Sequence, residues 1–266
     1  MSQIILIAKN ELSRLVRQPI IILLVCIVLA LSAINGMSAA AFISDVNLGH
    51  DPFLIPGLGN AFYNNSIFLS ALSAFIGVMA IGGDRSTNSI RVLLTKPLYK
   101  RDVLAGKYLG MLALILMIAA FCVLFGVAML LIFFGGPESA SEAIIRICTY
   151  VLMLFLNCAL TAAITMAIGV LVKNLLGTLI CVGSLFFFEW QVSLHGTILD
   201  LLGGFIYLNQ RILFFTAIGP GNINLFLTDS PYLVWLDNAS QYIVAMVIAL
   251  LAFMSLSFYV FCREDE

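Results

Sequence analysis

The sequence GGDRSTNSIRVLLTKPLYKRDVLAGKYLG runs from Gly82 to Gly110 and holds six of the thirteen Lys and Arg residues of the chain. The whole chain has 266 residues and is 62% hydrophobic but only 10% charged, with a mean hydropathy of +1.10. Soluble domains are about half apolar and about a quarter charged, so much of this chain is expected to face lipid. In such a chain, a concentrated basic stretch is typical of a cytoplasmic loop between two membrane spans.

Long uncharged runs lie on both sides of this stretch. A bilayer core needs about 20 mostly apolar residues in a helix. Backbone groups in lipid must bond within their own segment, so these runs predict helices rather than strands. We therefore predict an all-α integral membrane protein, a single transmembrane domain over residues 1–266. Its six spans are expected at about 20–43, 61–82, 107–134, 143–172, 175–194 and 237–261.

The basic residues also orient the predicted spans. With the N-terminus inside, eleven Lys and Arg residues fall on the inner side, and Arg146 and Arg211 fall on the outer side. The positive-inside rule then predicts that both termini are cytoplasmic, with 84–106 as a cytoplasmic segment. Residues 195–236 become extracytoplasmic. That segment mixes short apolar runs with Gly and Pro, which is typical of short outer-surface or re-entrant helices.

Residues 1–18 are predicted to form an interfacial helix. Arg14 and Arg17 lie opposite an apolar arc, and Pro19 breaks the helix just before the first span. Such a helix lies in the headgroup plane with its cations towards anionic lipid. A frayed cytoplasmic tail is the alternative. The arc consists of Ile4, Ala8, Leu12 and Leu15.

The middle of the quoted stretch predicts a short amphipathic helix. Ile90, Leu93 and Leu94 share one face, and Pro97 ends the helix. Basic side chains flank the apolar face, so the helix is suited either to anionic lipid or to a groove on a partner. An ordinary positive-inside loop is the alternative, but it explains the charges without explaining the apolar face or the proline.

The same residues resemble the permease subunits of type-2 ATP-binding-cassette (ABC) transporters. The chain reads IRVLLTKPL from Ile90, followed by Arg101, Val103-Leu104 and Gly106-Lys107, in the order of that family's pattern. The resemblance extends to the N-terminal IAKNELSRLVRQP, which is similar to the family's elbow helix, and to the six-span plan. Upstream of Ile90 the chain departs from the family, because GDRSTNS at 83–89 stands where relatives tend to carry two acids and Gly-Thr.

The resemblance implies that residues 90–97 form a coupling helix that contacts a separate cytoplasmic ABC ATPase, which binds ATP and Mg²⁺. It also implies a second permease protomer, which we expect to be an identical copy, and a place in the plasma membrane. The coupling residues implied are Ile90, Arg91, Leu93, Leu94, Lys96, Pro97 and Arg101.

The residues themselves predict no catalytic site on this chain. Lys107 follows a glycine but precedes Tyr108, so no Walker A phosphate loop is present. His50 and His195 belong to no metal-ligand spacing, and no nucleophile–base pair can be named. We therefore expect no enzyme activity, no cofactor, no metal and no nucleic-acid partner for this chain.

Two features are candidates for a transport pathway. The second span carries a stripe of small residues at helical spacing, which predicts either close helix packing or a pathway wall. In the fifth span, Glu189 is the only acid of an apolar segment. It either lines a pathway, with Asn157 of the fourth span at similar height as a possible partner, or marks the interfacial end of the span beside Trp190. The stripe consists of Ser66, Ser70, Ser73 and Gly77.

The sequence thus favours the membrane subunit of an ATP-driven exporter. Short outer loops and an apolar interior predict a hydrophobic or amphipathic substrate. Two alternatives remain open: a membrane anchor or regulatory subunit of an extracytoplasmic assembly, and a metal or ion permease.

Overall fold

The computed structural model describes residues 2–43, 58–80, 100–134, 136–137, 139–172, 174–194, 210–219, 223–226 and 230–263. Within these ranges the regular structure is entirely helical. The helices are α1 (Ser2–Val16), α2 (Pro19–Ile43), α3 (Leu58–Val78), α6 (Lys100–Phe134), α7 (Ala140–Val172), α8 (Leu175–Leu194), α10 (Gln210–Ile218) and α11 (Tyr232–Arg263).

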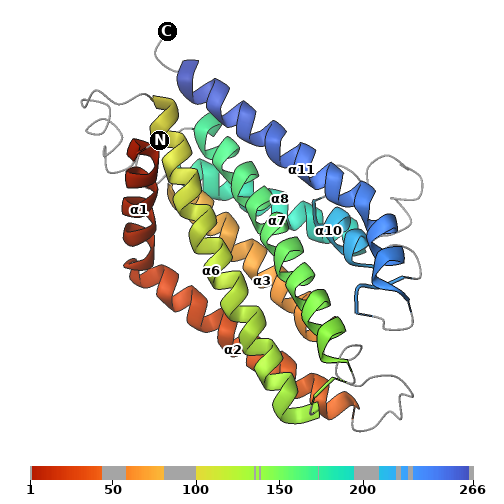
Figure 1. The fold of residues 1–266 in the computed structure, drawn as a ribbon. Coiled ribbons are helices and arrows are strands. Elements are labelled where there is room, and N and C mark those ends of the chain that lie inside the picture. Colours follow the sequence, from red (N-terminus) through yellow and green to blue (C-terminus); the bar gives the residue numbers. More distant parts are fainter. Residues whose placement is uncertain are drawn as a thin grey trace.

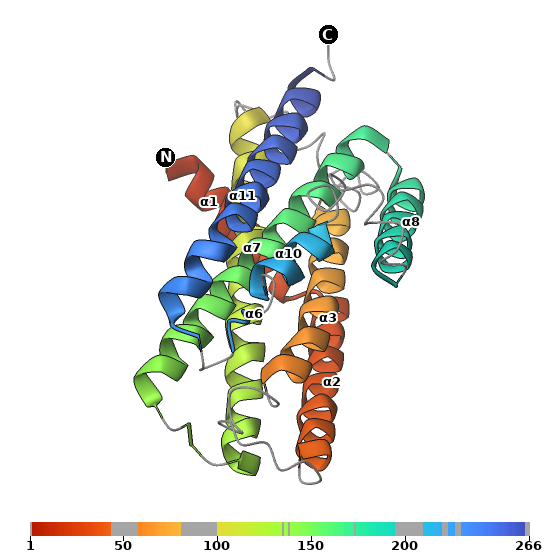
Figure 2. The same cartoon turned by 90° about the vertical axis from the view of Figure 1, so that its right-hand side faces the viewer.

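Helix α7 forms the centre of the bundle. Figure 1 shows it between α6 and α11, and Figure 2 shows α10 lying against it, with α8 at one side. Ala159, Ala162, Ala163 and Ala167 of α7 are all buried. Such small side chains let neighbouring helices approach closely, which explains why α7 contacts helices on several sides.

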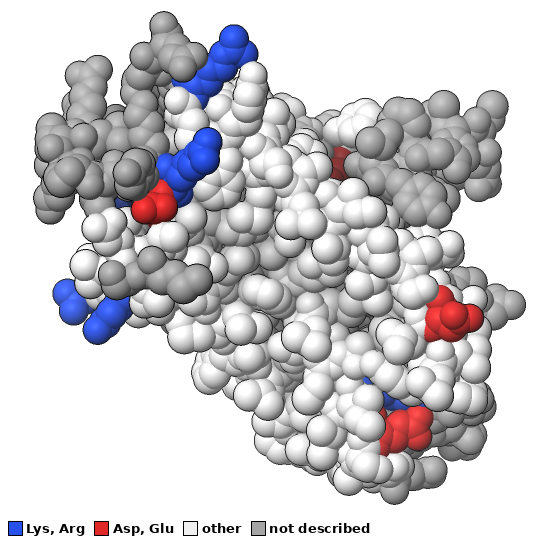
Figure 3. Space-filling view, turned by 45° about the horizontal axis from the view of Figure 1, so that its top comes forward, with Lys and Arg blue, Asp and Glu red and all other residues white. Residues whose placement is uncertain are grey.

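The outer surface of the bundle is apolar. Leu23, Leu124, Phe187 and Leu251, on four different helices, are each more than half exposed. Figure 3 shows a broad surface without charged side chains, and most of the Lys, Arg, Asp and Glu side chains in this view lie near its edges. An apolar surface of this size is costly in water and matches the hydrocarbon core of a bilayer.

Three described helical stretches are long and apolar enough to cross a membrane: Arg101–Ile132, Ala140–Val172 and Tyr232–Arg263. The pair Gln3–Val16 and Pro19–Ile34, bent by 68°, counts as a fourth if it is taken as one span, and two shorter apolar stretches lie in α3 and α8. The chain is therefore a multi-pass membrane protein.

Each predicted span overlaps a described helix, and the largest differences lie at the starts of α6 and α11. α6 begins at Lys100 rather than near 107, and α11 begins at Tyr232 rather than 237. The first turn of α6 holds Asp102, whose negative charge is favourable at a helix N-terminus. At α11, the carbonyl of Pro231 accepts bonds from the N–H groups of Val234 and Trp235, so the helix starts directly after the proline.

The N-terminal helix breaks where Pro19 predicted, since α1 ends at Val16 and α2 begins at Pro19. Its apolar arc packs on the start of α6, where Gly106 and Gly110 lie four residues apart. A Cβ atom at Gly106 would lie 2.7 Å from the side chain of Ile7, and one at Gly110 would lie 2.7 Å from the carbonyl oxygen of Ala8. This spacing of glycines permits the contact between backbones.

Gly110→Ala is therefore expected to destabilise the protein by about 1–3 kcal/mol, because the added methyl group overpacks the contact between α1 and α6. Gly183→Ala is the matched control, since a Cβ atom there meets nothing within 4 Å. Thermal unfolding of both variants in detergent checks this, and equal melting temperatures would contradict the close contact.

Candidate functional site

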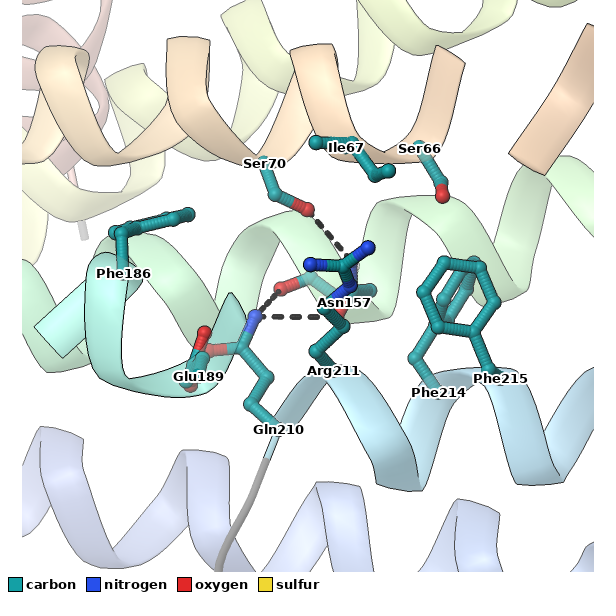
Figure 4. A pocket seen from close by; sticks show the side chains of 10 residues that line it. All are labelled: Ser66, Ile67, Ser70, Asn157, Phe186, Glu189, Gln210, Arg211, Phe214 and Phe215. Carbon is teal, nitrogen blue, oxygen red and sulfur yellow. Dashed lines mark hydrogen bonds between the residues drawn. The ribbon is translucent and has the colours of Figure 1, made fainter. Parts of the chain in front are cut away.

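A cavity of about 50 Å³ lies between α3, α7, α8 and α10. Figure 4 shows its lining, in which polar side chains from all four helices converge beside three phenylalanines. The volume exceeds the roughly 10–15 Å³ that one water molecule requires. The lining residues are Ser66, Ile67, Ser70, Asn157, Phe186, Glu189, Gln210, Arg211, Phe214 and Phe215.

Asn157 is the centre of a buried hydrogen-bond network. Its Nδ2 donates to Ser70 Oγ at 2.8 Å, and Gln210 Nε2 donates to both its backbone oxygen and its Oδ1 at 3.0 Å (Figure 4). Gln210 also donates to Thr161 Oγ1. Asn157 and Gln210 are both almost fully buried. Amide groups in an apolar interior need such partners, so this network fixes α10 against α7.

The position of α10 is fixed at its other end by Leu225 and by Trp235 of α11. The carbonyl of Ile218 accepts hydrogen bonds from Trp235 Nε1 and from the N–H of Leu225, each at 2.9 Å. Phe214 and Ala217 are buried on the inner face of α10. This short helix therefore presents Gln210 and Arg211 to the cavity from a position that both of its ends define.

Opposite charges face the same cavity from two helices. Glu189 enters from α8 and is half-buried, while Arg211 enters from α10, with its guanidinium carbon 5.7 Å from the centre of the Phe215 ring. A cation over an aromatic face gains about 0.5–2 kcal/mol, more where water is excluded. The cavity thus combines an acid, a base, neutral hydrogen-bonding groups and an aromatic wall.

The structure divides the predicted pathway residues into two groups. Ser66, Ser70, Asn157 and Glu189 line the cavity together, but the side-chain hydrogen bonds described for Asn157 join it to Ser70 and Gln210. Ser73 and Gly77 do not line it.

Those two residues instead lie within helix contacts. Ser73 is buried and its Oγ donates to the carbonyl of Leu69 in the same helix at 2.8 Å. Gly77 packs directly against Thr165 and so joins α3 to α7.

The sequence did not identify Gln210 or Arg211 as site residues. Arg211 was counted with the outer loops, since only its side of the membrane was considered. The sequence feature that could have identified them is a pair of polar residues, Gln210 and Arg211, directly before the apolar run of α10.

The predicted coupling residues from Ile90 to Pro97 lie outside the described residues. Arg101 is described and is exposed near the start of α6. It borders an open cleft with Tyr259 and Arg263 at the end of α11.

Comparison with known families gives one informative result. The sequence matches the family described as "ABC-2 family transporter protein" over residues 5–266, which is almost the whole chain. Curated proteins give no match. Together with its multi-pass helical fold, this match shows that the chain belongs to the ABC-2 family of transporter membrane proteins.

Proposed function

We propose that the chain is the permease subunit of an ATP-driven exporter. The observation that carries this proposal is the cavity between α3, α7, α8 and α10, in a chain of the ABC-2 family. A polar cavity among apolar helices is costly to maintain, and ionisable groups in such a place are functional candidates. The cavity is proposed as part of the substrate pathway.

The proposed arrangement in the membrane has six spans. They are α2, α6, α7 and α11 together with the shorter apolar helices α3 and α8. α1 serves as the interfacial elbow helix, and both termini face the cytoplasm at the plasma membrane. Figure 1 supports a common side, since the start of α1, the start of α6 and the end of α11 lie at one end of the bundle. The basic stretch at 84–106 fits the cytoplasmic side by the positive-inside rule.

A separate ABC ATPase is proposed as the source of energy. The family supports this partner, and the predicted coupling helix at 90–97 supplies a surface for it. Because such ATPases act in pairs, a second copy of this chain completes the transporter. ATP and Mg²⁺ would be bound by the ATPase.

The proposed substrate is hydrophobic or amphipathic. Phe186, Phe214 and Phe215 offer an apolar wall, whereas Asn157 and Gln210 offer an amide group each to a polar part of the substrate. A ligand with one polar group on an apolar body fits this division.

Co-expression with candidate ABC ATPases from the same genome tests the proposed function. The expected result is a stable complex whose ATP hydrolysis rises with some members of a panel of hydrophobic and amphipathic compounds. Failure of any ATPase to bind would favour the membrane anchor instead, and stimulation by inorganic ions alone would favour an ion permease.

Glu189→Gln is expected to preserve the complex but to lower the compound-stimulated ATPase rate by about tenfold, the effect of losing roughly 1.5 kcal/mol of a charge-assisted contact. Asp237→Asn is the matched control, because Asp237 is exposed at the start of α11. ATPase rates of the two purified complexes give the comparison. Equal stimulation in both would remove Glu189 from the pathway.

A further inference from the structure

Two opposite charges are buried where α1 meets α6. Lys107 and Glu11 are 5% and 6% exposed, and Lys107 Nζ lies 3.4 Å from Glu11 Oε2. The other carboxylate oxygen, Oε1, accepts a bond from Arg14 at 2.5 Å. Burying charges costs several kcal/mol each, so a buried pair of this kind is weak evidence for stability and calls for another reason.

Lys107 also contacts a third element. Its Nζ donates to the carbonyl oxygen of Ala80 at 3.4 Å. Ala80 lies two residues beyond the end of α3 and directly before residues 81–99, whereas Lys107 lies in the second turn of α6, which follows them. Carbonyls at the end of a helix lack partners within the helix, and a lysine is suited to cap them.

One side chain thus joins the residues on either side of 81–99, the stretch that contains the predicted coupling helix, to each other and to the N-terminal helix. The contact is close because Gly106, next to Lys107, lets α1 approach, with the carbonyl oxygen of Ile4 only 3.0 Å from where a Cβ atom would stand. A larger residue at 106 would hold α1 away from Lys107. The ion pair of Lys107 and the close packing at Gly106 therefore both hold α1 against the start of α6.

We propose that Glu11, Ala80 and Lys107 form a clamp, here called the Lys107 clamp, that makes α1, the end of α3 and the start of α6 move as one body. This inference rests on the proposed function, because the clamp would pass a displacement imposed by the bound ATPase to the helices that line the cavity. Lys107 is then a positioning residue. α3 carries Ser66 and Ser70, so a shift at Ala80 reaches the cavity along a single helix.

Hydrogen–deuterium exchange tests the clamp without the ATPase. Lys107→Met keeps an unbranched side chain but removes the charge and the donors. In this variant α1 amides are expected to exchange about tenfold faster, because the free energy of local opening falls. Lys9→Met is the matched control, since Lys9 lies on α1 and is exposed. Lys107→Arg retains charge and donors and is expected to restore slow exchange. Equal exchange in Lys107→Met and Lys9→Met overturns the clamp.

A second measurement tests transmission in the complex with the ATPase. Ile67→Cys places a thiol in the cavity lining, and its N-ethylmaleimide labelling is followed by peptide mass spectrometry with and without ATP and vanadate. In the otherwise native chain, ATP and vanadate are expected to change the labelling rate. Adding Lys107→Met is expected to abolish that change while the ATPase stays bound, and Lys107→Arg is expected to restore it.

The two failures are distinguishable. If ATP and vanadate alter labelling equally with and without Lys107→Met, the clamp is overturned and the proposed function stands. If no ATPase binds the otherwise native chain, or ATP has no effect on it, the proposed function fails and the transmission role fails with it. If Lys107→Met does not accumulate, Lys107→Gln, which keeps a donor without the charge, takes its place in both measurements.

Discussion

Arg146→Met is expected to destabilise the protein by about 3–5 kcal/mol, the cost of removing one partner from a buried charged network. Arg146 is fully buried near the start of α7. Its Nε and Nη2 donate to Glu142 Oε1 at 3.0 and 2.5 Å. Nη1 donates to the carbonyl of Leu225 at 2.5 Å, and Nη2 to that of Ser230 at 2.8 Å. Methionine fills similar space but donates to none of these oxygens.

The loss is expected to spread from Arg146 to the cavity. Leu225, which Arg146 holds by its carbonyl, bonds through its N–H to Ile218 at the end of α10. Releasing that turn loosens the helix that carries Gln210. Faster hydrogen exchange should therefore appear in α10 as well as near residue 225, together with a lower melting temperature.

Arg263→Met is the matched control for this prediction. Arg263 is exposed at the end of α11, and the side-chain bond described for it goes to the hydroxyl of Tyr259 in the same helix. Exposed pairs contribute about 0–1 kcal/mol, so this substitution should change stability little. If Arg146→Met and Arg263→Met melt at the same temperature, the network around Arg146 contributes nothing to the fold.

Arg146 also shows what the sequence could and could not predict. Hydropathy predicted where the apolar helices lie, because lipid imposes both the length and the apolar character of a helix. The same reasoning counted Arg146 only as an outer charge, although its acceptors, Leu225 and Ser230, are some 80 residues away in the sequence. Contacts over such separations depend on tertiary packing, which periodicity does not encode.

The N-terminal helix was likewise predicted only in part from the sequence. Helical spacing predicted its apolar arc, and Pro19 predicted the break, because both are local properties of the sequence. The burial of Glu11 was not, because it depends on Lys107 from α6 and on the glycines beside it.

At the cavity, the prediction was limited in the same way. Ser70, Asn157 and Glu189 were found as polar residues within apolar spans, a local signal. Gln210 was missed because the sequence around it, rich in Gly and short apolar runs, did not predict the position of α10, and only the fold brings it to Asn157.

Leu93→Asp with Leu94→Asp is expected to detach or uncouple the ATPase while the spans still insert. If Ile90, Leu93 and Leu94 enter a groove on the ATPase, burial of each side chain contributes about 1.5–3 kcal/mol to docking. Two aspartates remove most of that energy and add buried charge. Exposed basic residues of the segment add roughly 0–1 kcal/mol each, so Arg91→Ala should cost less.

The ranking of these two variants separates the coupling helix from an ordinary cytoplasmic loop. A loop that only orients the protein needs its cations and is indifferent to its leucines, so it predicts that Arg91→Ala is the more harmful change. ATPase co-purification and compound-stimulated turnover, compared at matched expression, measure the order. The Lys107 clamp adds a further expectation, because Lys107→Met should keep the ATPase bound whereas the double aspartate should release it. If the double-aspartate protein keeps a normally coupled ATPase, residues 90–97 are not the docking surface, and the energy for transport must enter the chain elsewhere.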